Sequence, residues 1–369
     1  MTGFEGNAGY TLWWPRGLFI DAIQDLHYRG AVSGMGRNWK DAVLLLLRQA
    51  FASKAPVDDF EQIYSEWEPS EDDVNPCLRW LRELADAAKS QTMGTRPYFS
   101  QRELDASISR ESSLPVIVGR VRSLVKRLFN ADYFCGELGY SCLHEPDSLL
   151  STPVRELDRR IGKPKLWGRV ETLWSESDLY DFIEVFHDLA ARPTRVWYCY
   201  AGCQKWHPTD QSREFGQALY RGLMNELLNT TALDLQIAAS GEDIGRLVQA
   251  SPEGVGQLIE EMLEGQSPAQ DQISHAIAIF RHREGTIEQR RSAVVALAGV
   301  LEERKALIEE KLLRNDAKDL FHIANKFHLR HQNEQQKKDY DPEFLDWIFY
   351  WYLATVNLSD QLLAKKAGS

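Results

Sequence analysis

The chain has 369 residues, of which 43% are hydrophobic and 26% are charged. This length suits two or three domains, and the composition is that of a globular protein, which excludes the disordered and collagen-like classes. The formal net charge of −11 excludes a general coat for nucleic acids, so any contact with a nucleic acid needs a local basic patch.

The cysteines and the apolar segments indicate the compartment. Five scattered cysteines argue against a disulfide framework and favour a reducing environment. The first residues lack a positive region followed by an apolar run, so we expect no secretory signal. The aromatic stretch Phe344–Leu358 is shorter than the ~20 residues that a membrane span needs. We therefore expect a cytoplasmic protein with no membrane contact.

Residues 1–130 are predicted to form a helical N-terminal domain of unknown role. Apolar residues at helical spacing predict helices over 39–51, 58–68, 77–90 and 114–129. The last of these follows two serines and carries Pro115 in its first turn, which are both signals for a helix start.

Residues 131–250 are predicted to form a small mixed α/β region. A helix is expected from Ser177 to Ala191, followed by a short strand over 196–200 and a helix over 214–228. The alternation of Leu233, Leu235 and Ile237 and a Ser-Gly turn predict a β-hairpin that returns over 246–248.

Residues 251–369 are predicted to form an antiparallel bundle of four long helices. Thr286 and Gln289 make a capping box that opens a helix to about Leu313. Asp341 and Pro342 open the last helix, which is apolar nearly all round. Such a helix is expected in the middle of a bundle or in a dimer interface. The fold class is therefore mainly α.

Cysteine and histidine spacing offers one candidate for a metal. Cys199, Cys203 and His207 are separated by three residues each, but no second close pair follows. Further ligands would come only through tertiary proximity, from Cys135, Cys142, His144 or His187. We therefore predict no metal and no cofactor, and keep the Cys199, Cys203 and His207 set as the candidate for zinc. The alternatives are buried thiols that pack in a core and a nucleophilic Cys203 beside His207.

A polar string between the last two bundle helices is the most unusual local feature. It gathers Asn325, Lys326, His328, Arg330 and His331 within seven residues. An arginine can hold a phosphate bidentately, and a histidine can move a proton near neutral pH. The alternative is a polar interhelical loop whose side chains cap helix carbonyls.

The order of these elements resembles a known family. Long helices, then a polar element with Asn, Arg and His, then an aromatic final helix, resemble HEPN-type bundles. The segment GQALYRGLMNELLNTTALDLQIAASGEDIGRLV is similar to the linker region of abortive-infection-type bacterial proteins that carry such bundles. The resemblance covers roughly residues 165–369.

The resemblance implies a site and an activity. Active HEPN proteins are usually dimeric, metal-independent ribonucleases. Arg330 would neutralise the phosphate, and His328 or His331 would assist attack by the 2′-hydroxyl. The histidine that the family carries downstream of its arginine is absent here, because residues 335–337 are Gln, Gln and Lys.

Apart from the resemblance, Arg281, His282 and Arg283 are expected in the loop between the first two bundle helices. In an antiparallel bundle this loop lies at the same end as the Arg330 loop, so these residues would form one RNA-binding pole with Asn325 and Lys326. The alternative is a solvated loop.

Two functions follow from the sequence. The first is a bacterial antiphage-defence or abortive-infection-type protein whose bundle is directed at RNA, and its catalytic form would be an endoribonuclease. Its partners would be RNA and either a second copy of the chain or another defence protein. The alternative is a non-catalytic interaction subunit that binds a partner protein or a regulatory ligand. The missing histidine favours this alternative.

Overall fold

The computed structural model describes residues 4, 7–33, 36–67, 75–89, 110–142, 145, 148–200, 202–251, 255–283, 285–311, 320, 322 and 342–367. These residues are mainly helical, with two antiparallel two-stranded hairpins, which confirms the mainly-α class. The chain forms two compact units, Met1–Leu233 and Asp234–Ser369. The three-part division at 130 and 250 and the HEPN type of the bundle stay predictions.

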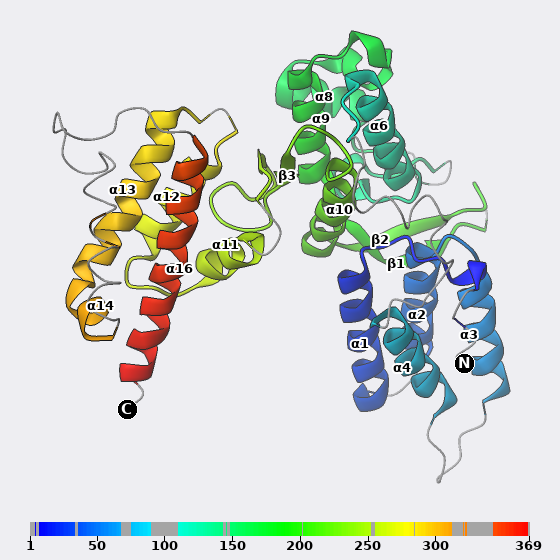
Figure 1. The fold of residues 1–369 in the computed structure, drawn as a ribbon. Coiled ribbons are helices and arrows are strands. Elements are labelled where there is room, and N and C mark those ends of the chain that lie inside the picture. The colour runs from blue at the N-terminus through cyan, green and yellow to red at the C-terminus, as the bar shows by residue number, and fades with distance from the viewer. Residues whose placement is uncertain are drawn as a thin grey trace. The chain divides into compact units, whose positions relative to one another are not determined.

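Four helices open the first unit and lie side by side (Figure 1). They are α1 (Arg16–Ser33), α2 (Arg37–Ala50), α3 (Ala55–Glu66) and α4 (Pro76–Lys89), preceded by a 3-10 turn at Ala8–Tyr10. Three of them confirm the sequence prediction to within three residues at each end. The helix α1 was not predicted, because its apolar and polar residues do not separate into clear stripes. It nevertheless buries Phe19, Ile23 and Leu26.

The remaining helices of the first unit surround a second aromatic core. They are α6 (Leu114–Asn130), α7 (Cys135–Leu138), α8 (Pro153–Ile161), α9 (Glu176–Leu189) and α10 (Arg213–Leu228), with 3-10 turns at Pro164–Gly168 and Glu171–Leu173. The helix α9 starts earlier than predicted. Ser175, rather than Ser177, is the N-cap residue. Its side-chain oxygen accepts a hydrogen bond from the Asp178 N–H, and the Asp178 carboxylate accepts one from the Ser175 N–H. This reciprocal capping box fixes the first turn of α9.

The hairpin β1 (Arg192–Tyr198) and β2 (Trp206–Ser212) joins the two groups of helices. Gln49 of α2 donates to the carbonyl of Pro193 and accepts from Arg192, which fastens β1 to α2. Only residues 196–200 were predicted as strand. The strand β2 was missed because it contains Pro208 and is largely exposed and polar, so it lacks the alternating apolar pattern of a half-buried strand.

Glu156 on α8 is a buried carboxylate held by three donors, namely Ser151, Arg159 and Arg160. Burial alone would raise the pKa of Glu156, but these hydrogen bonds outweigh it and lower the pKa to about 2. A depressed carboxyl pKa stabilises the fold above the ordinary value of 4.5, and this contribution is lost as the pH falls from about 4.5 towards 2.

We therefore expect Glu156→Gln to lower the urea midpoint of unfolding at pH 7. The difference from the wild type should shrink steadily from about pH 4.5 towards pH 2, because over this range the unfolded chain takes up a proton at Glu156 while the folded chain keeps the carboxylate ionised. Asp158→Asn on the exposed side of the same helix is the control, and it should change little. A difference that stays constant between pH 7 and pH 3 would contradict this assignment.

The second unit begins with the hairpin β3 (Leu235–Ile237) and β4 (Leu247–Gln249), as predicted. Its helices are α11 (Val255–Glu264), α12 (Gln270–Arg281), α13 (Ile287–Glu303), α14 (Lys305–Lys311) and α16 (Pro342–Ala367). The helices α12, α13 and α16 lie side by side (Figure 1). Their core includes the rings of Phe280 and Phe349, which stack with centroids 3.7 Å apart. The third predicted bundle helix lies almost wholly outside the described residues.

The helix predicted from Thr286 to about Leu313 is interrupted at Arg304. The capping box of Thr286 and Gln289 is confirmed, but α13 ends at Glu303 and α14 starts at Lys305. The nearly buried Arg304 side chain donates to the Val356 carbonyl and to Ser359, and it forms an ion pair with Asp360. Through these contacts, the residue at which the helix is interrupted is held against the last helix, α16. That helix buries one face in the core, and Phe344, Trp347 and Leu358 on it are exposed.

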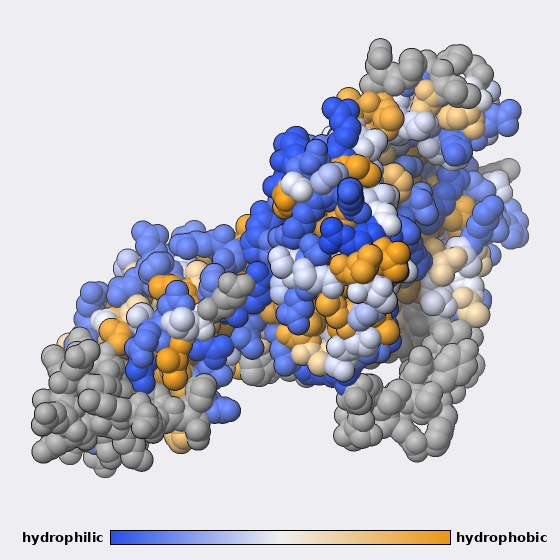
Figure 2. Space-filling view, turned by 90° about the horizontal axis from the view of Figure 1, so that it is seen from above, coloured by the Kyte–Doolittle hydropathy of each residue, from blue (hydrophilic) through white to orange (hydrophobic). Residues whose placement is uncertain are grey.

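No described helix combines the length and the apolar character that crossing a lipid bilayer requires. The face in Figure 2 is mostly hydrophilic, and its hydrophobic side chains gather in separate patches.

Candidate metal centre

The turn between β1 and β2 gathers two thiols and an imidazole. Cys199 follows the last residue of β1, Cys203 lies in the turn, and His207 is the second residue of β2. The Cys199 N–H donates to the Lys205 carbonyl at 2.9 Å, and Gln204 takes a left-handed conformation with φ of 52°. This backbone reversal brings the three side chains together.

A second loop supplies Cys142 from a distant part of the sequence. Gly139 has a φ of 69°, and a Cβ placed there would lie 1.8 Å from the carbonyl oxygen of Ser148. The Tyr140 N–H donates to that carbonyl, and the Leu150 N–H donates to the Leu138 carbonyl. The loop therefore folds back on itself, and glycine is the residue that permits it. The fold places Cys142 against the hairpin turn.

The four side chains converge on one point. The Sγ of Cys142 lies 3.8 Å from the Sγ of Cys199 and 3.8 Å from the Sγ of Cys203. The Cys203 Sγ lies 2.8 Å from Nε2 of His207, and all four ligand atoms lie within 4.8 Å of one another. A tetrahedral zinc ion with ~2.3 Å Zn–S bonds separates two sulfurs by about 3.8 Å. The thiol spacing therefore matches zinc coordination.

The surroundings favour the thiolate of Cys199 and hold the imidazole in place, whereas burial and the contact with Cys142 raise the pKa of Cys203. Burial alone would raise the pKa of Cys199, but the backbone N–H groups of Cys203 and Gly202 outweigh it and lower the pKa. The His207 ring stacks on Tyr140 with centroids 4.4 Å apart and packs beside Trp197. Cys142, Cys199 and His207 are buried, and Cys203 is half-buried. Ligands fixed in this way suit a structural zinc site.

The structure selects among the ligands that the sequence left open. It adds Cys142 to the predicted set of Cys199, Cys203 and His207, so it favours zinc over the expectation of no metal. Cys135 instead bonds to Asp132, and His187 lies on α9 between Asp188 and Arg221. His144 lies outside the described residues.

The RNA-directed residues expected in the bundle are only partly described. Asn325, Lys326, His328, Arg330 and His331 lie outside the described residues. His282 is exposed after α12, and Arg283 is half-buried.

Arg281 corrects one expectation, because it is the last residue of α12 and not part of a surface loop. Its side chain is 7% exposed, and its Nε has no hydrogen-bond partner among the described residues. Burial lowers the pKa of Arg281, and Asp243 and Glu260 oppose that change. A buried guanidinium cannot serve as a surface contact for phosphate, so Arg281 leaves the predicted RNA-binding pole.

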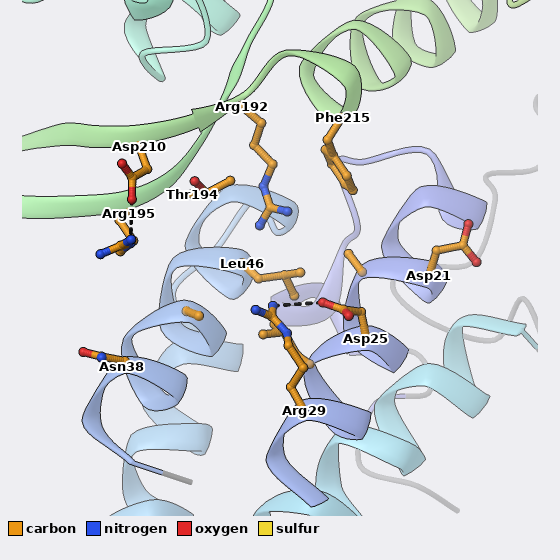
Figure 3. A pocket seen from close by; sticks show the side chains of 13 residues that line it. Asp21, Asp25, Arg29, Asn38, Leu46, Arg192, Thr194, Arg195, Asp210 and Phe215 are labelled. Atoms are coloured by element: carbon orange, nitrogen blue, oxygen red, sulfur yellow. Dashed lines mark ion pairs between the residues drawn. The ribbon is translucent and has the colours of Figure 1, made fainter. Parts of the chain in front are cut away.

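A cavity of about 690 Å³ lies beside β1, between α1 and α2 (Figure 3). Two of its arginines are paired, Arg29 with Asp25 at 2.9 Å and Arg195 with Asp210 at 2.6 Å. Arg192 points into the cavity, and its guanidinium lies over the rings of Trp14 and Phe215. Burial lowers the pKa of Arg192 to about 10, so it stays charged at neutral pH. The cavity therefore holds one cation without an ion-pair partner among the described residues.

Comparison of the chain with protein-family models, curated proteins and solved structures gives no match.

Proposed function

We propose that the chain is a zinc-dependent, non-catalytic binding protein, in which Cys142, Cys199, Cys203 and His207 hold a structural zinc ion. The observation that carries this proposal is the convergence of the four ligand atoms, with two sulfur–sulfur separations of 3.8 Å. A thiol–imidazole hydrogen bond accounts for the contact between Cys203 and His207, but it does not require two further thiols to converge on the same pair.

The number of ligands supports a structural role. Three thiolates and one imidazole fill the four positions of tetrahedral zinc, whereas catalytic zinc keeps one position for water or substrate. The same four ligands argue against a nucleophilic Cys203, because a thiolate bound to zinc as its fourth ligand is not free to attack. This favours the non-catalytic alternative drawn from the sequence.

The metal would give the hairpin a fixed tip. Cys142 and Cys199 are 57 residues apart, so the ion would cross-link the loop after α7 to the turn between β1 and β2. Lys205 and Trp206 lie between the ligands Cys203 and His207. Their positions therefore depend on the metal, and a binding surface at this tip is formed only when the ion is present.

Metal analysis of the purified protein tests the proposal. We expect inductively coupled plasma mass spectrometry to find one equivalent of zinc per chain, and we expect the protein to keep this zinc through gel filtration. Titration of native protein with a thiol reagent should modify three more cysteines after the zinc is removed by a chelator. A chain that carries less than about a tenth of an equivalent of zinc after expression in zinc-supplemented medium would contradict the proposal.

The ribonuclease implied by the HEPN resemblance is a separate prediction. A ribonuclease would degrade total RNA incubated with zinc-loaded protein in a buffer without added metal, and Arg330→Ala combined with His331→Ala would slow that decay about 100-fold or more, whereas the non-catalytic protein proposed above leaves the RNA intact. A chelator is left out of this assay, because it would also remove the proposed zinc. Equal decay with both proteins, or no decay with either, would contradict the ribonuclease.

A further inference from the structure

Three neighbouring cavities surround Trp206 at the base of the hairpin tip. They measure about 340, 300 and 300 Å³, and Trp206 lines all three. The second and third also share Arg48, and the first and second share Asp132. Together they form a path between α2, the end of α6 and the hairpin, which we call the Trp206 groove.

Two cations of this groove lie on aromatic rings. The Arg48 guanidinium lies 5.5 Å from the ring centre of Trp206, and the Arg127 guanidinium lies 3.9 Å from that of Trp13. Both arginines are exposed, and neither forms an ion pair within the described part of the chain. Arginines placed in this way keep their N–H edges for a ligand while their flat faces are covered.

Aromatic rings are exposed beside these cations. Trp206 is 49% exposed and Tyr200 is 83% exposed. Tyr198 contacts both, with ring centres 5.2 Å from Trp206 and 4.7 Å from Tyr200. The three rings form a cluster at the hairpin tip. Exposed rings that neighbour unpaired cations are typical of surfaces on which unpaired bases stack.

The charge of the groove differs from that of the whole chain. Its cavities are lined by the cations Arg48, Arg127 and Lys205, by the carboxylates of Asp41 and Asp132, and by Arg195, whose charge is offset by its ion pair with Asp210. A local excess of cations on a chain of net charge −11 indicates an anionic partner.

We infer that the Trp206 groove binds single-stranded nucleic acid. Arg48, Arg127 and Lys205 contact phosphates, and Trp206 and Tyr200 stack on bases. A duplex offers the phosphates but not the faces of its bases, so it binds more weakly. This inference rests on the proposed function, because the zinc ligands Cys203 and His207 flank Lys205 and Trp206.

Fluorescence anisotropy with the zinc-loaded full chain tests the inference. The probes are labelled 15-nucleotide oligo(U), oligo(dT) and a 15-base-pair duplex, with polyglutamate as competitor. We expect oligo(U) or oligo(dT) to bind at least about tenfold more tightly than the duplex. A preference between the first two distinguishes an RNA strand from a DNA strand.

Three variants address the groove directly. We expect Trp206→Ala to weaken binding about tenfold, since a stacked base is lost. Arg48→Gln and Arg127→Gln should each weaken binding and reduce the salt dependence by about 0.7 per lost phosphate contact. The controls are Trp347→Ala, a tryptophan 52% exposed in the second unit, and Arg82→Gln, an exposed arginine on α4. Both should bind like the wild type.

Zinc content is measured for every variant, so the two proposals fail in different ways. Groove variants that keep one equivalent of zinc and bind like the controls would overturn the inference and leave the zinc proposal intact. No binding of either single strand by zinc-loaded protein would also overturn it. Displacement of oligo(U) by an equal charge of polyglutamate would assign the groove to an acidic protein and overturn it as well. Tight binding by wild type stripped of its zinc would overturn the claim that the binding surface depends on the metal, and it would leave the groove assignment intact.

Discussion

Replacing Cys199 by serine is expected to abolish zinc binding and to lower the thermal stability of the first unit sharply. A serine hydroxyl does not replace a thiolate as a zinc ligand, and three remaining ligands hold zinc far less tightly. The ion also closes a 57-residue loop, and a cross-link over that length stabilises a fold by on the order of 4 kcal/mol. We expect a fall in Tm of at least about 10 °C.

The matched control for this variant is Cys135→Ser. Cys135 is also a buried thiol of the first unit, but it bonds to Asp132 and does not belong to the metal cluster. It should keep one equivalent of zinc and lose little stability. A chelator should lower the Tm of the wild type and of Cys135→Ser, and leave that of Cys199→Ser unchanged. Equal zinc content and equal Tm in the two cysteine variants would rule out the centre.

The second large effect is expected from Phe349→Ala in the second unit. Phe349 is fully buried, and its ring stacks on Phe280 with an interplanar angle of 3°. Truncation removes the buried ring and leaves a cavity, which costs about 3–5 kcal/mol. The unfolding of the second unit should therefore shift to lower urea concentration, as followed by the exchange of its backbone amides.

Phe344→Ala is the control for this prediction, because Phe344 lies on the same helix and is 47% exposed. Its cost should stay within about 0.5 kcal/mol. Zinc should stay at one equivalent in both variants, since the four ligands belong to Met1–Leu233. Similar urea midpoints for the two phenylalanine variants would show that α16 is not packed as described.

Local signals explain which helices could be predicted from the sequence. Thr286 and Gln289 give a capping box that needs no tertiary partner, and the structure confirms it. The helix α1 carries no such signal and is held by its packing, so only tertiary contacts reveal it. The interruption at Arg304 also depends on distant groups, namely the Ser359 hydroxyl and the Asp360 carboxylate. No window of the sequence contains that information.

Part of the metal centre could likewise be predicted from the sequence, and part of it is revealed only by the fold. The spacing of Cys199, Cys203 and His207 is visible in the sequence, because one turn carries all three. Cys142 comes from a loop 57 residues earlier, and only the fold shows that it, rather than Cys135, completes the set. Trp206 was not singled out, because its exposure depends on how β2 pairs with β1. The signal available in the sequence was its place between two metal ligands.

The left-handed backbone of Gly139 also bears on the order of events during synthesis. Cys142 leaves the ribosome well before Cys199, Cys203 and His207, and a single thiol holds zinc weakly. The hydrogen bonds that close the Gly139 reversal join residues 138–150 to one another, so they need no group from the hairpin that is made later. A side chain at residue 139 would collide with the Ser148 carbonyl, so the loop could not close in this way and Cys142 would lose its place beside the hairpin.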